Sequence, residues 1–160
     1  MGFATLYRKE VHRFLKVGVQ TIAAPVVTTL LFFAVFALAL GGIVRTAGQT
    51  PFLEFLAPGL VMMTMVQNAF ANTSSSVISA KVTGSIVDVL MPPLSPLEWT
   101  LAYVAGGVTR GVMVGICTLI AMSFFVPIAI VNPGLIVFHL IAASMMMALL
   151  GLLAGIWSER

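Results

Sequence analysis

Few side chains in this sequence have the types and spacing that chemistry needs. The carboxylates number five, and no two of them stand at the spacing of a catalytic acid–base pair: Glu10, Glu54, Asp88, Glu98 and Glu159. The sequence contains no G-x-x-x-x-G-K-S/T phosphate loop, no H-E-x-x-H and no G-x-S-x-G. The single cysteine, Cys117, excludes an intrachain disulfide and a cysteine-based zinc site. We therefore expect no catalytic residue, no bound cofactor and no metal in this chain, which is not an enzyme by itself.

The composition shows what kind of elements must position the remaining polar groups. Of the 160 residues, 60% are apolar and 8% are charged, against about 25% charged in an ordinary soluble domain. At a mean hydropathy of +1.12, the polar residues are too few to cover a soluble globule. Disordered chains are polar and charged, so disorder is excluded as well. The sequence describes an integral membrane protein.

Long windows without charge predict membrane-spanning helices. No charged residue lies between Lys16 and Arg45 or between Glu54 and Lys81. A helix needs about 20 mostly apolar residues to cross about 30 Å of hydrocarbon, and no alternating strand pattern is visible. We predict an all-α membrane protein with a single transmembrane domain over residues 1–160. The four predicted spans cover residues of about 17–41, 57–80, 99–126 and 134–157.

The distribution of Lys and Arg predicts the orientation. Arg8, Lys9, Arg13 and Lys16 precede the first span, Lys81 follows the second, and Arg160 follows the fourth. On the other side only Arg45 is found. Because basic residues collect on the cytoplasmic side, we expect both termini and the 81–98 loop in the cytoplasm.

An amphipathic helix is predicted over residues 3–16, ahead of the first span. Apolar residues recur there at steps of three and four, while the basic residues, Arg13 included, and His12 fill the other face. Such a helix is either a topological anchor in the cytoplasmic interface or a docking shelf for a cytoplasmic partner. His139 lies near the outer end of the last span, so the two histidines cannot share a metal.

The second span is the most polar one, and its polar residues fall at steps of three or four. They are Thr64, Asn68, Asn72, Ser75 or Ser76, and Ser79. Polar side chains in hydrocarbon usually face protein or water. Two interpretations stay open: hydrogen bonds that hold a bundle or dimer together, or a wall of a translocation path.

Arg110 is the one basic residue predicted to lie inside the bilayer. It follows Trp99 by eleven residues, roughly 16 Å along a helix, which is close to the midplane. An arginine there faces the bundle, a cavity or a partner. It either extends toward the cytoplasm and pairs with carbonyls, or attracts an anion on a substrate path.

Glycines at steps of four predict close helix packing in the last two spans. They are Gly107, Gly111 and Gly115 in the third span and Gly151 and Gly155 in the fourth. Small residues on one face let two backbones approach closely. The pattern indicates packing and no particular chemistry.

The loop KVTGSIVDVLMPPLSPLE, residues 81–98, predicts a short helix over 84–91 that ends at Pro92-Pro93. Ser95-Pro96-Leu97-Glu98 then begins the next helix, with proline early and an acid in the first turn. A short cytoplasmic helix bounded by prolines is a rigid lever between two spans.

These residues resemble the permease subunit of type 2 ATP-binding-cassette exporters. The resemblance rests on "APG" at the start of the second span, on "GSIVDVLMPPLSPLEW" and on the N-terminal "LYRKEVHRFLK". It implies export of a polysaccharide, lipid-linked glycan, lipid or drug from a bacterial-type inner membrane. It also implies two partners besides the lipid bilayer: a cytoplasmic ATP-binding subunit, which hydrolyses the ATP, and a second permease subunit in a homo- or heterodimer. No nucleic-acid partner is expected.

The resemblance implies a role for the loop as well. Residues 84–98 match the coupling helix that docks the ATPase, and residues 3–16 match the interfacial elbow helix. The ATPase contacts implied in this way are Val87, Asp88, Val89, Leu90, Met91 and Glu98.

One feature departs from this family. Its permeases have six spans and this chain has four predicted spans, so the sequence is either truncated or a shortened relative. Two other functions remain open: a four-helix scaffold or assembly subunit without transport, and a secondary carrier or channel. The carrier is disfavoured because no carboxylate lies inside a predicted span to pair with Arg110 or His139.

Overall fold

The computed structural model describes residues 2–40, 46–47, 50–91, 93–127 and 132–158. Arg45, Pro92, residues 128–131 of the loop before the last helix, Glu159 and Arg160 lie outside the described residues. The helices are α1 (Gly2–Lys16), α2 (Gly18–Leu40), α3 (Phe52–Val82), α4 (Ile86–Leu90), α5 (Pro96–Ser123) and α6 (Pro133–Trp157). A small antiparallel pair of strands, β1 (Thr46–Ala47) and β2 (Thr50–Pro51), precedes α3 and had no counterpart in the sequence expectations.

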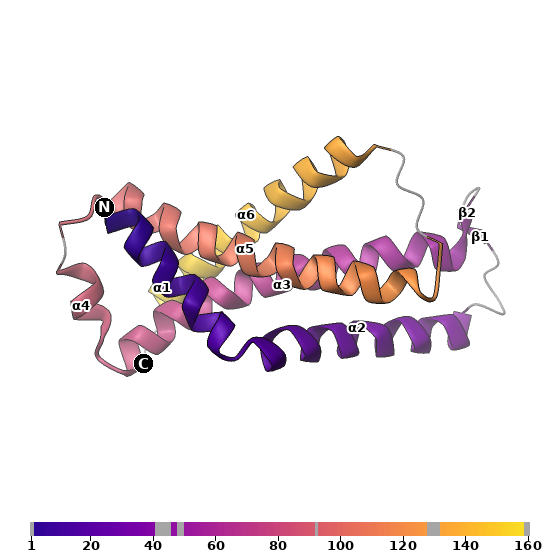
Figure 1. Cartoon of the computed structure of the whole chain (residues 1–160), viewed down its shortest axis with the longest axis horizontal. Helices are drawn as coiled ribbons and strands as arrows, with labels where there is room; N and C mark the ends of the chain where they lie inside the picture. Colours follow the sequence, from indigo (N-terminus) through magenta and orange to yellow (C-terminus); the bar gives the residue numbers. More distant parts are fainter. Residues whose placement is uncertain (1, 41–45, 48–49, 92, 128–131, 159–160) are drawn as a thin grey trace.

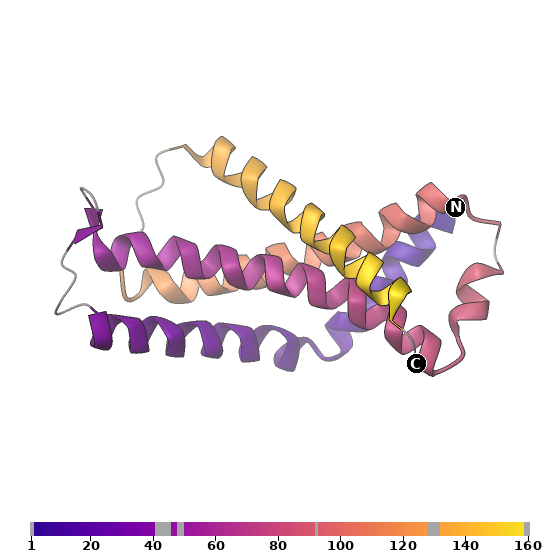
Figure 2. The ribbon, with the colours of Figure 1, turned by 180° about the vertical axis from the view of Figure 1, so that it is seen from behind.

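Helix α3 is the centre of the bundle (Figure 1). It packs against α5 and α6, and also against α2. The C-terminal half of α6 lies against α3, whereas the N-terminal half of α6 diverges from it toward Pro133 (Figure 2). The beginning of α1, the end of α6 and α4 gather at one end of the bundle, whereas β1 and β2 lie at the other. The elements assigned to the cytoplasm from charge therefore share one end.

Three of the helices are long and apolar enough to cross a membrane: α2, α5 and α6. The chain is thus an all-α membrane protein, but the expected count of four spans is not confirmed. The second predicted span lies within α3, which has 31 residues and a length of about 46 Å. Its Thr, Asn and Ser side chains lower its hydropathy, and this explains why it does not stand out with the others.

Local sequence determines where α5 begins and where α3 ends. Ser95 Oγ accepts a hydrogen bond from the Glu98 backbone N–H at 3.2 Å, and the Glu98 carboxylate accepts from the Ser95 N–H at 3.1 Å. This is a capping box, with Pro96 in the first helical turn. At the other junction Gly84 has a φ of 74°, a left-handed conformation that glycine adopts at low cost. The chain turns there from α3 into α4.

Glycines allow α3 to approach its neighbours closely. A Cβ on Gly111 would lie 2.8 Å from the Met65 carbonyl oxygen, and a Cβ on Gly107 would lie 2.9 Å from Thr73. The other three glycines singled out from the sequence also face α3: Gly115 against Met65, Gly151 against Phe70 and Thr73, and Gly155 against Ser74 and Val77. The α5–α3 and α6–α3 contacts are therefore built on these small residues.

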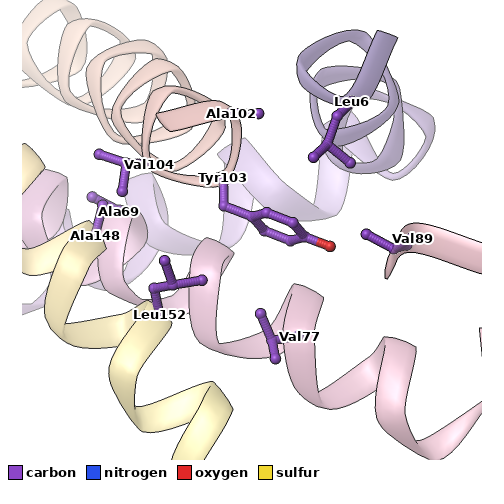
Figure 3. Close-up of a cluster of buried hydrophobic side chains, with 9 residues drawn as sticks. All are labelled: Leu6, Ala69, Val77, Val89, Ala102, Tyr103, Val104, Ala148 and Leu152. Atoms are coloured by element: carbon purple, nitrogen blue, oxygen red, sulfur yellow. The ribbon is translucent and has the colours of Figure 1, made fainter. Parts of the chain in front are cut away.

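A buried apolar cluster joins five helices at the α4 end (Figure 3). Leu6 of α1, Val77 of α3, Val89 of α4, Tyr103 of α5 and Leu152 of α6 belong to it. The Tyr103 ring is fully buried and its hydroxyl end is directed toward the space between Leu6, Val77 and Val89. Helix α4 is thereby anchored to the bundle.

Candidate functional site

Four polar residues of α3 form a buried stripe at steps of four, which we call the α3 stripe: Thr64, Asn68, Asn72 and Ser76. Each of them meets a side chain from another helix. Thr64 Oγ1 lies 2.5 Å from Thr29 Oγ1 of α2, and the other three residues meet α5 and α1. The stripe therefore runs along the inside of the bundle.

The α1 end of the stripe contains an ion pair between a buried carboxylate, Glu10, and a partly exposed arginine, Arg13. Glu10 of α1 is 1% exposed, and its Oε1 accepts a hydrogen bond from Ser76 Oγ at 2.8 Å. Its Oε2 lies 3.4 Å from Arg13 Nε. Arg13 Nη2 donates to the backbone oxygen of Asn72 at 2.9 Å and to its Oδ1 at 3.0 Å. Gly106 of α5 lies against both Glu10 and Asn72, so α1, α3 and α5 meet at this polar cluster.

Sequence reasoning missed Glu10 as a site residue and put Arg13 on the polar face of α1. Glu10 follows Leu6 by four residues and precedes Phe14 by four, and all three are buried. A carboxylate in the middle of the apolar stripe was the signal that could have identified it. Gly106 of α5 makes room for it, since a Cβ there would lie 2.9 Å from Glu10 Cβ.

A further bond ties α1 to the bundle at Tyr7. Its hydroxyl lies 2.9 Å from Thr109 Oγ1 of α5. Together with Glu10 and Arg13, it fixes α1 to both α3 and α5. The N-terminal helix is therefore a packed part of the bundle, with Arg8 and Lys9 on its exposed side.

Arg110 lies in the middle of α5 and is half-buried. Its Nη2 donates to Asn68 Oδ1 at 3.3 Å, while Asn68 Nδ2 donates to the Thr64 carbonyl at 2.9 Å. The Nε of Arg110 is buried and has no hydrogen-bond partner among the described residues.

A pocket of about 310 Å³ lies between α2 and α3, next to Asn68. Its lining combines polar residues, among them Thr28 and Gln67, with the apolar side chains of Phe32 and Met63. Pro25, in the interior of α2, also lines it. The pocket thus brings polar groups of two helices to one place at mid-length of the bundle.

The structure separates the serines that the sequence placed with the stripe. Ser76 is buried and belongs to it, whereas Ser75 and Ser79 are exposed on another face of α3. They line a shallow groove with Phe70 and Ile78. One set of polar residues therefore bonds inside the chain, and the other faces its surroundings.

The residues of the α4 region that are implied in ATPase coupling differ in exposure. Val87, Leu90 and Met91 are 57%, 63% and 77% exposed, and Asp88 is exposed too. Val89 is buried against the bundle. Asp88 and Val89 line a pocket of about 320 Å³ shared with α1. Exposed apolar residues on a helix that is itself anchored are typical of a docking surface.

Glu98 and the histidines have local roles. The Glu98 carboxylate caps α5 through Ser95. His12 Nδ1 lies 3.1 Å from the Arg8 carbonyl and His139 Nδ1 lies 2.7 Å from the Leu135 carbonyl, each within one helix turn. Within the described ranges, no three His, Cys, Asp or Glu residues come together as metal ligands.

Comparison with known proteins identifies the family. The whole chain, residues 1–160, matches the ABC-2 type transporter family. The chain belongs to this family. It is 34% identical over 159 residues to the inner membrane transport permease YadH of Escherichia coli K12, and to the protein of the same name in Shigella flexneri. The alignments cover 99% of this chain and 62% of each relative, so the chain spans less than two thirds of the length of these relatives. No solved structure matches it.

The resemblance inferred from the second span and the loop that follows is thus confirmed at the level of the family. Membership in the ABC-2 type transporter family and the apolar helices α2, α5 and α6 make the chain an integral membrane protein.

Proposed function

We propose that the chain is part of the permease subunit of an ATP-binding-cassette exporter. In this proposal it lies in a bacterial inner membrane and moves a lipid, glycan or drug-like substrate out of the cytoplasm. A separate cytoplasmic subunit binds and hydrolyses ATP. The family supports a transporter membrane subunit, and the name of the relatives, inner membrane transport permease, supports the location.

The observation that carries this proposal is the arrangement of α4. Leu90 and Met91 are exposed, whereas Val89 on the same short helix is buried against Leu6 and Tyr103. A partner that binds Leu90 and Met91 and then moves would push on Val89, and through it on α1 and α5. This is the mechanical requirement for coupling ATP-driven motion to a membrane bundle.

Orientation and assembly follow in the same proposal. The α4 end, with the beginning of α1 and the end of α6, faces the cytoplasm, as the excess of Lys and Arg favours. Helix α3 crosses the bilayer beside α5, with its polar stripe turned toward the other helices. Two permease subunits, equal or different, enclose the path, and alternating access follows ATP-driven closure of the ATPases.

The test is co-purification with the cognate ATP-binding subunit. The double variant Leu90→Ala/Met91→Ala removes exposed apolar surface without touching the core, so we expect at least a tenfold loss of ATP-binding subunit retained. Leu135→Ala, on α6 away from the α4 end and 59% exposed, is the matched control and is expected to retain it. Equal retention by the double variant and the control would contradict docking on α4, and would favour a scaffold subunit without nucleotide-dependent behaviour.

A further inference from the structure

The charges around the α3 stripe do not balance. Two arginines, Arg13 and Arg110, and one carboxylate, Glu10, contact it. Glu10 pairs with Arg13, the single salt bridge found among the described residues. Arg110 has no carboxylate partner there, and its Nε is buried without a hydrogen bond. A positive charge left uncompensated inside a membrane helix is costly unless it meets an anion or water.

The position of Arg110 argues against a side chain that extends to the end of the bundle and exposes its charge to water there. It follows Pro96, the first residue of α5, by 14 residues, about 21 Å of helix. Its guanidinium is directed sideways to Asn68 on α3 and not along α5 toward the α4 end. An anion that neutralises it must therefore enter the bundle from the side, at mid-depth.

The pocket between α2 and α3 reaches the hydrogen-bond partner of Arg110. Asn68 lies in its lining and accepts from Arg110, which is not itself a lining residue, so an anion in the pocket reaches Arg110 by taking the place of the Asn68 amide oxygen. Thr28 and Gln67, both exposed, add hydroxyl and amide groups that can donate to an oxyanion. At 3.3 Å, the bond from Arg110 to Asn68 is longer than a charge-assisted hydrogen bond normally is, so an oxyanion can compete for the guanidinium.

The remaining lining indicates that the anion carries an apolar tail. Phe32 and Met63 line the same pocket and are 50% and 48% exposed. Leu31, next to Phe32, is 61% exposed on α2, one of the three helices apolar enough to span a membrane. A headgroup in the pocket would leave its tail against these side chains, in hydrocarbon.

We propose that the pocket between α2 and α3 binds a phospholipid-like anionic amphiphile, whose phosphate pairs with Arg110 beside Asn68. Gln67 and Thr28 hold the remaining phosphate oxygens, and Phe32 contacts the tail. The bound phosphate supplies the negative charge that Arg110 does not find among the described residues. The site does not depend on the docking of an ATP-binding subunit to α4.

Thermal unfolding of the purified chain in a neutral detergent tests this site with three probes. They are dioctanoyl-phosphatidylglycerol, dioctanoyl-phosphatidylcholine with the same tails but no net charge, and inorganic phosphate with no tail. A ligand that binds only the folded chain raises the Tm, by about 5–10 °C when it is present at a hundred times its Kd. We expect this rise with phosphatidylglycerol alone. Equal rises with phosphatidylcholine or with inorganic phosphate would overturn the proposal.

Variants test whether the rise in Tm comes from the pocket between α2 and α3. Arg110→Gln should abolish the rise with phosphatidylglycerol, whereas Arg8→Gln, which removes an exposed arginine of α1, should keep it. Gln67 is exposed, so we expect Gln67→Leu to leave the bundle intact. This variant should raise the Kd for phosphatidylglycerol at least threefold in a titration. If Arg110→Gln does not fold, Gln67→Leu provides the test. Unchanged binding in Gln67→Leu and Arg110→Gln would contradict the site. No ATP-binding subunit is present, so failure here leaves the coupling proposal untouched.

Discussion

Ser76 Oγ of α3 donates a 2.8 Å hydrogen bond to Glu10 Oε1 of α1, and both residues are buried. The bond joins the first helix of the chain to the central one. Because Glu10 also pairs with Arg13, which in turn bonds Asn72 of α3, α1 is held to α3 at two successive turns. Val89 of α4 belongs to the same buried cluster as Leu6 of α1. The α4 end of the bundle is therefore one mechanical unit, in which α4 packs against the helix that Glu10 holds in place.

Replacing Glu10 should loosen this unit. Glu10→Ala removes the acceptor of Ser76 and the ion-pair partner of Arg13, so we expect the free energy of unfolding to fall by about 1.5–3 kcal/mol, the size of a hydrogen bond to a charged group. Thermal unfolding of the purified chain measures it, with Glu54→Ala as the control because Glu54 is exposed. Equal melting temperatures for the two variants would show that the Glu10 cluster does not hold α1.

The close approach of α5 to α3 makes a second prediction. Gly111→Ala places a methyl group 2.8 Å from the Met65 carbonyl oxygen and 3.2 Å from Ala69 Cβ, so the helices must separate. We expect a loss of about 1–3 kcal/mol from overpacking. Gly59→Ala is the matched control, since nothing lies within 4 Å of its new Cβ, and it should be neutral or stabilising. A Gly111→Ala variant as stable as Gly59→Ala would contradict the packing.

Neighbouring residues of α4 should separate stability from coupling. Val89→Ala removes buried methyl groups, and we expect a lower melting temperature corresponding to about 1–2 kcal/mol. Leu90→Ala should leave the melting temperature unchanged and reduce stimulation of the ATP-binding subunit's hydrolysis in reconstituted vesicles. A Leu90→Ala variant that is destabilised as much as Val89→Ala and still stimulates hydrolysis normally would contradict the assigned sides of α4.

Lys81 offers a test of how the end of α6 is held. Its Nζ donates to the carbonyl oxygens of Ile156, at 2.5 Å, and Ser158, at 3.0 Å, groups that a helix C-terminus leaves unpaired. Lys81→Met should speed amide hydrogen exchange in the last turn of α6, while Lys9→Met, on the exposed side of α1, should not. Unaltered exchange in Lys81→Met would show that Lys81 does not stabilise this end.

The sequence predicted the helices better than their contacts, and the reason is physical. Runs of apolar residues bounded by Ser95-Pro96 or by Pro133 define α5 and α6 without any tertiary information. Ser75 and Ser76 differ by about 100° around α3, and tertiary contacts such as the bond from Ser76 to Glu10 of α1 decide which of them is buried. The burial of Glu10 was not predicted, because a carboxylate is expected on the polar face of an amphipathic helix. The bonds of Arg13 and Arg110 join residues 59 and 42 positions apart, and no local pattern encodes them.

The central claim is that the exposed side of α4 is where the ATP-binding subunit docks. A photo-crosslinking amino acid at Met91 in intact membranes tests it most directly, with the same substitution at Ile136, in the other half of the bundle and 42% exposed, as the control. The account predicts a cross-linked product between Met91 and the ATP-binding subunit and none from Ile136. A product from Ile136 alone, or none from Met91 when both subunits are present, would contradict it.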